Sequence, residues 1–589
     1  MKMRLICLLL SVVMLLACLA GCAKKTDEEV KDDITEEASA STITLSMYLM
    51  SEAPVSAEQA AKIEAAVNKI TKAKFKTQMK LTFLTADQYY TVLEQNIALQ
   101  EQNIGNYDNV ASSDETTEPE TQWNEELQVV ELKYPTIQPY QVDIFYFNGQ
   151  EKFEDYFAKE YLTRLDEELS SASKSIKSYI TPAYLTHMKS LADGTYAVPS
   201  NKPIGEYTYL LLNKEALAET QFAASDGFTS ATCDNVQDLL DMIATNVEWS
   251  DKYVPLYSSE GVLDVDAISD FQYWGVDENG NLSNSFSVMG GAIDTSKKYG
   301  KEGALSPVGN IFADNSSFVN QLKTLKLYQK NGYYNDEAVK GGKDFAVGYV
   351  KGGADLVLEY GDKYEMVVID APTLTTEDLY KDMFGVSAYT SNVSRSMEIL
   401  TYLYTNEDFR NLILYGIEGE NYEVIKSELK DVNGEIYPLI RVLNDDYKMS
   451  ADKTGNVLIA TPLVGEQANR IEYYKQQNMD AIVAQNICFD LDYYEDIKVD
   501  MDKLLEVRKL SETIYKELLE CDYDGLAELI AAKKKQVNDD KNVSFHTNIM
   551  NNNLDDEENE DPEKLTSLTF IYYTWLEELK IYIPPKEGE

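Results

Sequence analysis

The chain of 589 residues has a formal net charge of −47, 44% hydrophobic residues and 11% aromatic residues, including 41 tyrosines. This acidity excludes nucleic acid as a partner, because phosphate contacts need clustered Lys and Arg, and it disfavours anionic ligands. The apolar content is nevertheless sufficient for large cores, and the length indicates two or more domains.

The first residues are typical of an export signal. The apolar run from Leu5 to about Leu19 is too short for a membrane span but suits the core of a signal peptide. Its end, "LAGC", resembles a bacterial lipobox, so we expect residues 1–21 to be removed and Cys22 to be lipidated. A cut before Cys18 fits less well. An ordinary secretory signal with a chance cysteine is the alternative, and it also exports the chain.

Residues 22–41 are predicted to form a flexible tether. After Cys22, "AKKTDEEVKDDITEEASAS" is polar and charged, so it can bury too little surface to become ordered. A diacylglyceryl group would supply two acyl chains at about 0.8 kcal/mol per buried CH2, which is enough for stable attachment. We therefore expect a lipid-anchored protein at the extracytoplasmic face of the cell membrane.

An alternation of strands and helices follows the tether. "TITLSMYLM" (42–50) predicts a strand, and the next segment begins with a capping box of Ser56 and Gln59 before a helical stripe. "QMKLTFL" predicts a second strand, and "ADQYYTVLEQNIALQEQ" a second helix. The acidic segment 112–127 is interpreted as an inserted, mobile loop.

The next strand and helix define the expected fold class. "QVDIFYFNG" (141–149) has the continuous apolar run of a central parallel strand, and "QEKFEDYFAKEYLTRLDEEL" continues as a helix with an aromatic core stripe. This succession predicts a doubly wound α/β sheet that binds ligands beyond the carboxyl ends of its strands. Near the C-terminus, Leu504, Leu510 and Leu518 belong to an amphipathic helix, and residues 567–583 predict another.

Few residues are available for catalysis or metal binding. Only His187 and His546 occur, and no G-x-S-x-G, P-loop or Rossmann glycine pattern is present. "DENGN" (277–281) is interpreted as a hairpin turn, because its glycine falls too early for a calcium loop. We therefore expect no cofactor, no metal and no enzyme. Paired carboxylates of the glycosidase kind are left open among 100 Asp and Glu residues.

The cysteines beyond the lipobox give no disulfide framework and no metal-ligand spacing. They are far apart in the sequence and odd in number: Cys233, Cys488 and Cys521. Buried thiols are the expected state, although one pair could form a bridge if the fold brought it together.

Several later segments carry a specific pattern. These are "ADGTYAVPSN" (192–201) followed by "YTYLLLNKEAL", "KDFAVGYVKGGADLVLEYGD" (343–362) followed by "VVIDAPT", and "KTGNVLI" (453–459). The longest is "FGVSAYTSNVSRSMEILTYLYTNEDFRNLILYGIEGENYEV" (384–424). Together they resemble the bacterial extracellular solute-binding proteins of family 1, of the carbohydrate type, and "YGIEGENYE" resembles a signature of their LipO-like branch. The similarity extends over about residues 42–500.

That resemblance implies a type II periplasmic-binding-protein-like fold with two α/β lobes, a hinge and a cleft between the lobes. Because the chain of such proteins crosses between lobes more than once, each lobe is expected to be discontinuous. Lobe 1 would comprise 42–150 and 384–455, and lobe 2 would comprise 151–383 and 456–589.

The resemblance also implies a function. It is that of a monomeric, lipid-anchored receptor that captures a carbohydrate, by expectation an oligosaccharide, and delivers it to the permease subunits of an ABC transporter. Two alternatives stay open: an exported carbohydrate-active enzyme that uses paired carboxylates, and a ligand-binding subunit of a sensor.

Sugar sites combine polar side chains with aromatic platforms, and the tyrosine content fits such a site. The candidate ligand-binding residues, chosen by their positions at strand ends, turns and the family's crossing strand, are Ser51, Glu52, Asn148, Gln150, Tyr257, Ser258, Tyr360, Asp362, Tyr389 and Trp274. Each has a structural alternative as a turn or packing residue. In "YGIEGENYEV", Gly416 and Gly419 are expected to end a helix and turn the chain, and a structural role is favoured for Glu418 and Tyr422.

Overall fold

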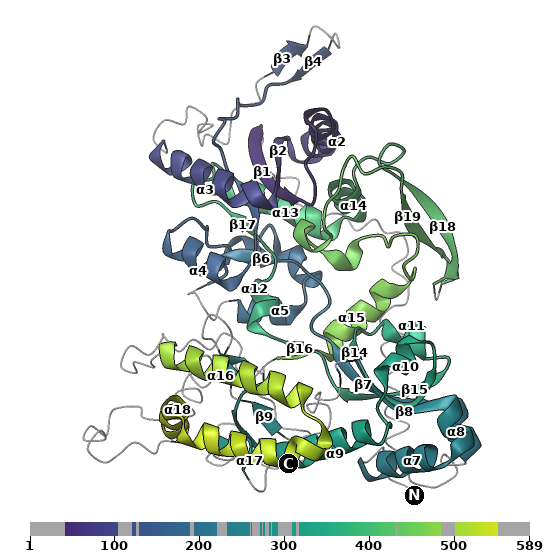
Figure 1. Cartoon of the computed structure of the whole chain (residues 1–589). Helices are drawn as coiled ribbons and strands as arrows, with labels where there is room; N and C mark the ends of the chain where they lie inside the picture. The colour runs from purple at the N-terminus through teal and green to yellow at the C-terminus, as the bar shows by residue number, and fades with distance from the viewer. Residues whose placement is uncertain are drawn as a thin grey trace, which may run out of the picture.

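The computed structural model describes residues 42–103, 121–124, 129–188, 194–220, 233–259, 261, 271–273, 275–276, 282–283, 286–292, 309–313, 317–431, 433–483 and 501–551. Within these residues the protein is a mixed α/β structure with two mixed sheets, which confirms the predicted fold class (Figure 1). Cys22, Trp274, Cys488 and residues 567–583 lie outside the described residues.

Sheet 1 has five strands in the order β2-β1-β5-β17-β6. The strands are β1 (Ile43–Ser51), β2 (Thr77–Thr85), β5 (Ile144–Phe147), β6 (Ala197–Pro199) and β17 (Met383–Val386). β1 is parallel to β2 and β5, whereas β17 is antiparallel to β5 and β6. All nine residues of β1 are buried, because helices cover both faces of the sheet.

The helices of this half are α2 (Ala57–Phe75), α3 (Ala86–Gln102), α4 (Gln150–Ala158), α5 (Pro182–His187), α13 (Val393–Thr405) and α14 (Glu407–Tyr415). The predicted aromatic stripe is confirmed as core, since Phe153 and Tyr156 are buried. The predicted length of its helix is wrong. α4 ends at Ala158, because Glu160 adopts a left-handed conformation with φ 55°.

The segment 112–127 was expected to be a loop, but part of it is a strand. β3 (Thr121–Asn124) pairs antiparallel with β4 (Val129–Leu132), with Trp123 opposite Val130. Figure 1 shows this hairpin extending away from sheet 1.

Sheet 2 has four strands in the order β15-β7-β14-β8. The strands are β7 (Tyr207–Asn213), β8 (Tyr253–Ser258), β14 (Asp344–Gly352) and β15 (Tyr364–Asp370). β7 is antiparallel to both neighbours, and β14 is parallel to β8. The surrounding helices are α6 (Lys214–Thr220), α7 (Cys233–Thr245), α8 (Val247–Lys252), α9 (Ser317–Lys330), α10 (Asp336–Lys340) and α11 (Leu356–Tyr360).

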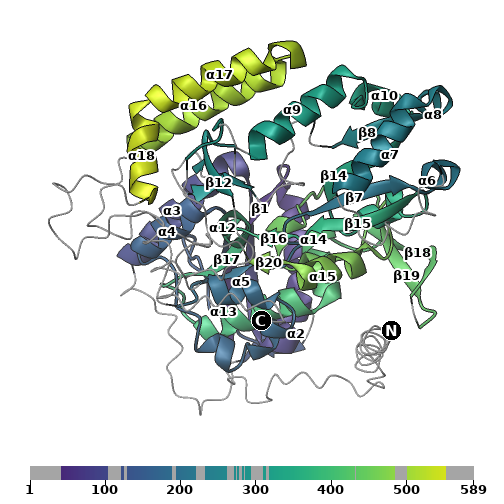
Figure 2. The same cartoon turned by 90° about the horizontal axis from the view of Figure 1, so that it is seen from below.

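A third group of elements, formed by the C-terminal helices, packs against α9. Figure 2 shows it as a layer of three helices, α16 (Met501–Glu520), α17 (Tyr523–Asp539) and α18 (Lys541–Asn551). Leu504, Ile514 and Leu518 are buried, which confirms the predicted amphipathic face. α17 contacts β13 (Gly309–Asn310), which forms a three-stranded sheet with β12 (Met289–Ala292) and β9 (Phe271–Tyr273). Cys521, between α16 and α17, is a free thiol.

The strands that flank the predicted hairpin turn do pair. β10 (Gly275–Val276) is antiparallel to β11 (Leu282–Ser283), with Val276 opposite Leu282. The turn itself and the neighbouring Trp274 lie outside the described residues.

Two linkers join the sheets. The first linker, residues 200–206, runs from β6 to β7; the second, residues 371–382, runs from β15 to β17 and contains β16 (Thr373–Leu374) and α12 (Thr376–Tyr380). The linkers lie between the sheets together with β20 (Ile482–Val483), which pairs with β16, and α15 (Arg470–Asp480). The division into lobes stays a prediction, and the pairing with β17 places β6 in the sheet of β1.

Candidate functional site

Strand register determines which candidate residues share an edge of sheet 1. Met383, at the start of β17, pairs with Phe147 at the end of β5 and with Pro199 at the end of β6. Since β1 and β2 are parallel to β5, their carboxyl ends lie at this edge too. We call it the linker-facing edge of sheet 1, because both linkers join the sheet there. It carries Ser51, Glu52, Asn148 and Gln150.

Sheet 2 has a corresponding linker-facing edge. Gly352 at the end of β14 pairs with Tyr207, and Asp370 at the end of β15 pairs with Thr208 at the start of β7. Ser258 at the end of β8 pairs with Tyr349 nearby in β14, so the candidates Tyr257 and Ser258 lie here. The seven residues of the first linker span at most about 25 Å, so the two edges are close at this point.

Three other candidates lie at the opposite edges. Tyr360 and Asp362 precede β15, whose first residue, Tyr364, pairs with Asn213 at the far end of β7. Tyr389 follows β17 at the amino end of β5, and its carbonyl accepts a hydrogen bond from Gln100 Nε2 at 3.0 Å. The structure therefore does not bring these three residues together with the candidates at the linker-facing edge of sheet 1, although Tyr360 shares the Phe345 ring with Tyr257 of sheet 2.

The loop after β1 is held by the chain around residue 450. Ser51 is 2% exposed and its Oγ has no hydrogen-bond partner among the described residues. Glu52 donates its backbone N–H to Lys448 O at 3.0 Å, and its carboxylate pairs with Lys453 Nζ at 2.7 Å. Glu52 is thus the accessible member of this pair of candidates.

A tyrosine missed by the sequence analysis organises the loop after β5. Tyr90, in the first turns of α3, donates its hydroxyl to Asn148 Oδ1 and accepts the Asn148 N–H at 3.1 Å. Lys152 Nζ lies 4.9 Å from the centre of the Tyr90 ring and pairs with Glu94 at 2.7 Å. Burial raises the pKa of Tyr90 to about 12, so its phenol stays protonated at neutral pH. The position of Tyr90 near the start of the helix that follows β2 could have indicated, from the sequence, that it lies at this edge of the sheet.

On sheet 2 the aromatic candidates Tyr257 and Tyr360 both pack against Phe345. The Tyr257 ring lies 5.0 Å from that of Phe345 with an interplanar angle of 27°, and Phe345 lies 4.5 Å from Tyr364. Tyr360 contacts the same Phe345 ring at 6.4 Å. Ser258 is 8% exposed, and its Oγ lacks a partner among the described residues. Packing alone accounts for Tyr257 and Tyr360, and their contact with ligand stays a prediction.

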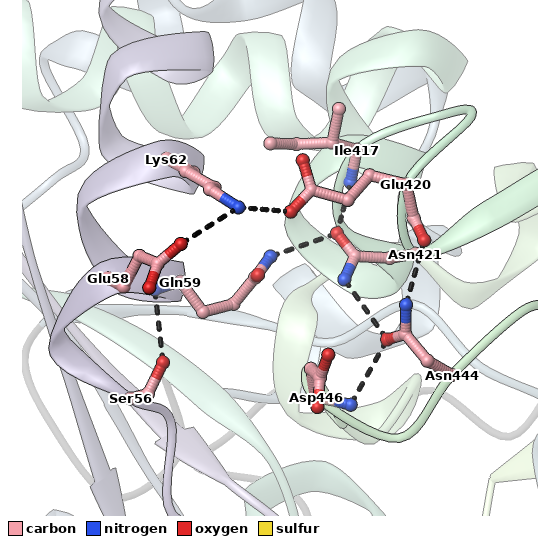
Figure 3. Close-up of polar contacts among 9 residues, drawn as sticks. All are labelled: Ser56, Glu58, Gln59, Lys62, Ile417, Glu420, Asn421, Asn444 and Asp446. Carbon is pink, nitrogen blue, oxygen red and sulfur yellow. Dashed lines mark hydrogen bonds and ion pairs between the residues drawn. The ribbon is translucent and has the colours of Figure 1, made fainter.

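The turn role predicted for the glycines of the signature loop is confirmed, and the structural role favoured for Glu418 and Tyr422 stays a prediction. Gly416 ends α14 with φ 91°, and Gly419 has φ 82°. Figure 3 shows Gln59 and Lys62 of α2 directed at the loop. Asn421 Oδ1 accepts hydrogen bonds from Gln59 Nε2 and Ile417 N, both at 2.9 Å. The loop is therefore fixed to the first turns of α2, next to the Glu52 loop.

Replacing Asn421 by Ala is expected to lower the free energy of unfolding by about 1–3 kcal/mol, because it leaves the buried amides of Gln59 and Ile417 without an acceptor. Urea unfolding followed by circular dichroism measures the change. Glu420→Ala is the matched control, since the Glu420–Lys62 pair is exposed (39% and 43%) and its loss should change stability by at most about 0.5 kcal/mol. Equal losses from both variants would contradict the role of Asn421.

Neither a metal centre nor a membrane span emerges from the part of the chain that the structure describes. In those residues no cluster of three or more His, Cys, Asp or Glu side chains could hold a metal ion. Nor does any helix there combine the length and apolar character needed to cross a bilayer.

No family model and no curated protein matches the sequence, whereas the structure aligns with solved structures at TM-scores below 0.5. The N-glycan transport solute-binding protein NgtS from Streptococcus pneumoniae aligns with a TM-score of 0.48 and 18% identity, covering 86% of this chain and 97% of its own. An ABC-transporter-associated, HMO-binding solute-binding protein from Bifidobacterium longum infantis gives 0.45 and 12%, covering 92% and 100%. Likenesses at these scores and identities assign no ligand to this chain.

Proposed function

We propose that this chain is a lipid-anchored receptor of an ABC importer that captures a neutral carbohydrate, an oligosaccharide, in a cleft between two lobes. The observation that carries the proposal is the arrangement of two α/β sheets whose linker-facing edges are joined by two linkers. Closure of two lobes around a ligand is a known mode of hinge motion, and it needs only a few connecting residues to rotate.

The chemistry of the linker-facing edge of sheet 1 supports a polyhydroxylated ligand. Asn148 is exposed beside Tyr90, and Glu52 is exposed at the end of β1. Amides, carboxylates and phenols of this kind bind sugar hydroxyls, and aromatic rings pack on the C–H faces of sugars. These residues therefore provide the mixture of groups that a carbohydrate site requires.

The charges at the edge of sheet 1 support a neutral ligand. Lys152 and Lys453 lie there, and each is paired with a carboxylate at 2.7 Å, from Glu94 and Glu52 respectively. An anionic ligand would have to compete with these carboxylates and approach a chain with a net charge of −47. A neutral saccharide meets neither obstacle.

We also propose that the receptor is anchored to the membrane and works with permease subunits. Acylation of Cys22 would hold the receptor at the extracytoplasmic face, with residues 22–41 as the tether. Permease subunits would accept the ligand from the receptor, which acts as a monomer without catalysis. The two lobes would divide near the linkers, so that β6 belongs with lobe 1.

Isothermal titration calorimetry with a panel of neutral glycans tests the function. We expect saturable binding of at least one glycan, and chromatography should recover that glycan unchanged. New reducing ends would instead indicate the alternative enzyme with paired carboxylates. If no glycan binds, the proposed ligand class is wrong, and an assay of gene induction would then test the sensor alternative.

A pair of variants tests the assignment of the edges. Asn148→Ala is expected to weaken glycan binding about tenfold, because it removes a polar contact at the linker-facing edge. Tyr360→Phe, at the remote edge, should bind with unchanged affinity. The same loss in both variants, or in Tyr360→Phe alone, would contradict this placement of the site.

A further inference from the structure

A buried carboxylate joins both linkers to sheet 1. Asp382, the last residue of the second linker, is 7% exposed and accepts a hydrogen bond from Lys202 Nζ of the first linker at 2.7 Å. Its backbone carbonyl accepts the N–H of Ser200 at 2.8 Å. The two linkers are therefore tied together at the point where they meet the sheet.

The same carboxylate reaches the candidate ligand loop. Tyr146, in β5, donates its hydroxyl to Asp382 Oδ1 at 2.6 Å. Burial, with the Asp382 charge, raises the pKa of Tyr146 and keeps this phenol a donor. Three residues further along, Gly149 donates its N–H to Tyr380 O of the second linker at 2.7 Å. The loop that carries Asn148 is thus bonded to the second linker on both sides.

The first linker is also bonded to α15, whose Asn478 donates to Lys202 O and accepts the N–H of Ile204, both at 2.8 Å. Gln477 Nε2 of α15 donates to Ile204 O at 2.9 Å and to Gly205 O at 2.7 Å. Gln477 Oε1 accepts the N–H of Ala354, just beyond β14 of sheet 2, at 2.9 Å. Lys202 is held by Asp382, and Ile204 is held by Gln477. Residue 203 is the only residue of the first linker between these two attachments.

We propose that Asp382 is a positioning residue for ligand capture: it fixes the direction in which both linkers leave sheet 1 and couples that direction to the Asn148 loop. The inference deepens the proposed function and rests on it for the role of the loop. With the carboxylate paired on both oxygens, rotation of sheet 2 is confined to the residues beyond Lys202 and before Asp382. Without it, Lys202 is a buried charge lacking its partner, and the linkers must rearrange.

Three variants of the full chain test the proposal. Asp382→Asn and Lys202→Met each remove one charge of the pair, and the double variant removes both. We expect each single variant to bind its glycan about tenfold more weakly, within the range usual for coupled sites, and to change the radius of gyration of the ligand-free protein in X-ray scattering. The double variant should recover part of both losses, because no unpaired charge stays buried.

Glu420→Gln is the matched control, because the exposed Glu420–Lys62 pair lies on the flank of sheet 1 and touches neither linker. It should leave affinity and scattering unchanged. If Asp382→Asn gives no folded protein, Tyr146→Phe carries the same comparison, since it removes only one hydroxyl, and a smaller change in the same direction is expected.

Unchanged scattering and affinity in the single variants would overturn the proposal. A loss of affinity that follows a fall in Tm, with unchanged scattering of the ligand-free protein, would also overturn it, because Asp382 would then serve stability alone. If the unaltered protein binds no glycan, the proposed function fails, while the scattering comparison still decides whether Asp382 positions the linkers.

Discussion

Arg410→Met is expected to lower the free energy of unfolding by about 3–5 kcal/mol, because it removes the donors from three buried acceptors at once. Arg410 of α14 is fully buried and donates to Ala451 O at 2.7 Å, Thr454 Oγ1 at 2.6 Å and Asn456 O at 3.0 Å. Burial lowers its pKa to about 10, so the guanidinium is still charged at neutral pH.

The three acceptors belong to the segment that follows Lys448, whose carbonyl holds the Glu52 loop. Urea unfolding measures the loss of stability, and glycan calorimetry should show weaker binding, since the support of that loop is loosened. Arg441→Met is the matched control. Arg441 is paired with Glu423 in an exposed hairpin (54% and 43%), so its loss should change stability by at most about 0.5 kcal/mol. Equal denaturation midpoints of the two variants would refute the role of Arg410.

Gly205→Ala is expected to lower the free energy of unfolding by about 2–4 kcal/mol, through backbone strain and a direct clash. Gly205 has φ 49°, and a Cβ built on it would lie 2.8 Å from both the N and the O of Thr373. The two linkers therefore cross here in backbone contact. A methyl group would force them apart, because backbone atoms cannot move aside as a flexible side chain can.

Gly434→Ala separates the two effects. Gly434 also has a positive φ, 83°, but a Cβ there would meet no atom within 4 Å. Its replacement should cost only the left-handed strain, about 1 kcal/mol. Thermal unfolding of both variants measures the difference. If they lose the same stability, the close approach of Gly205 to Thr373 does not matter, and the crossing of the linkers is not tightly packed.

Local pattern in the sequence was enough to predict two central strands of sheet 1 and a helix of the C-terminal layer. The apolar runs of β1 and β5 and the helical stripe of α16 are properties of neighbouring residues, and the structure confirms all three. Two local predictions were wrong. The helix after β5 ends early at a left-handed Glu160, and the expected loop contains β3, because a few backbone angles or cross-strand pairs outweigh a sequence trend.

The sequence by itself determined the α/β class, the strands and helices just named, and the turn role of Gly416, since each depends on residues near one another in the chain. Only the tertiary structure decided which strand ends share an edge. It separated Tyr360 and Tyr389 from Asn148, because a strand's direction within its sheet is not encoded in its own residues. It also joined Lys202 to Asp382, a contact between residues that only the folding of both linkers brings together.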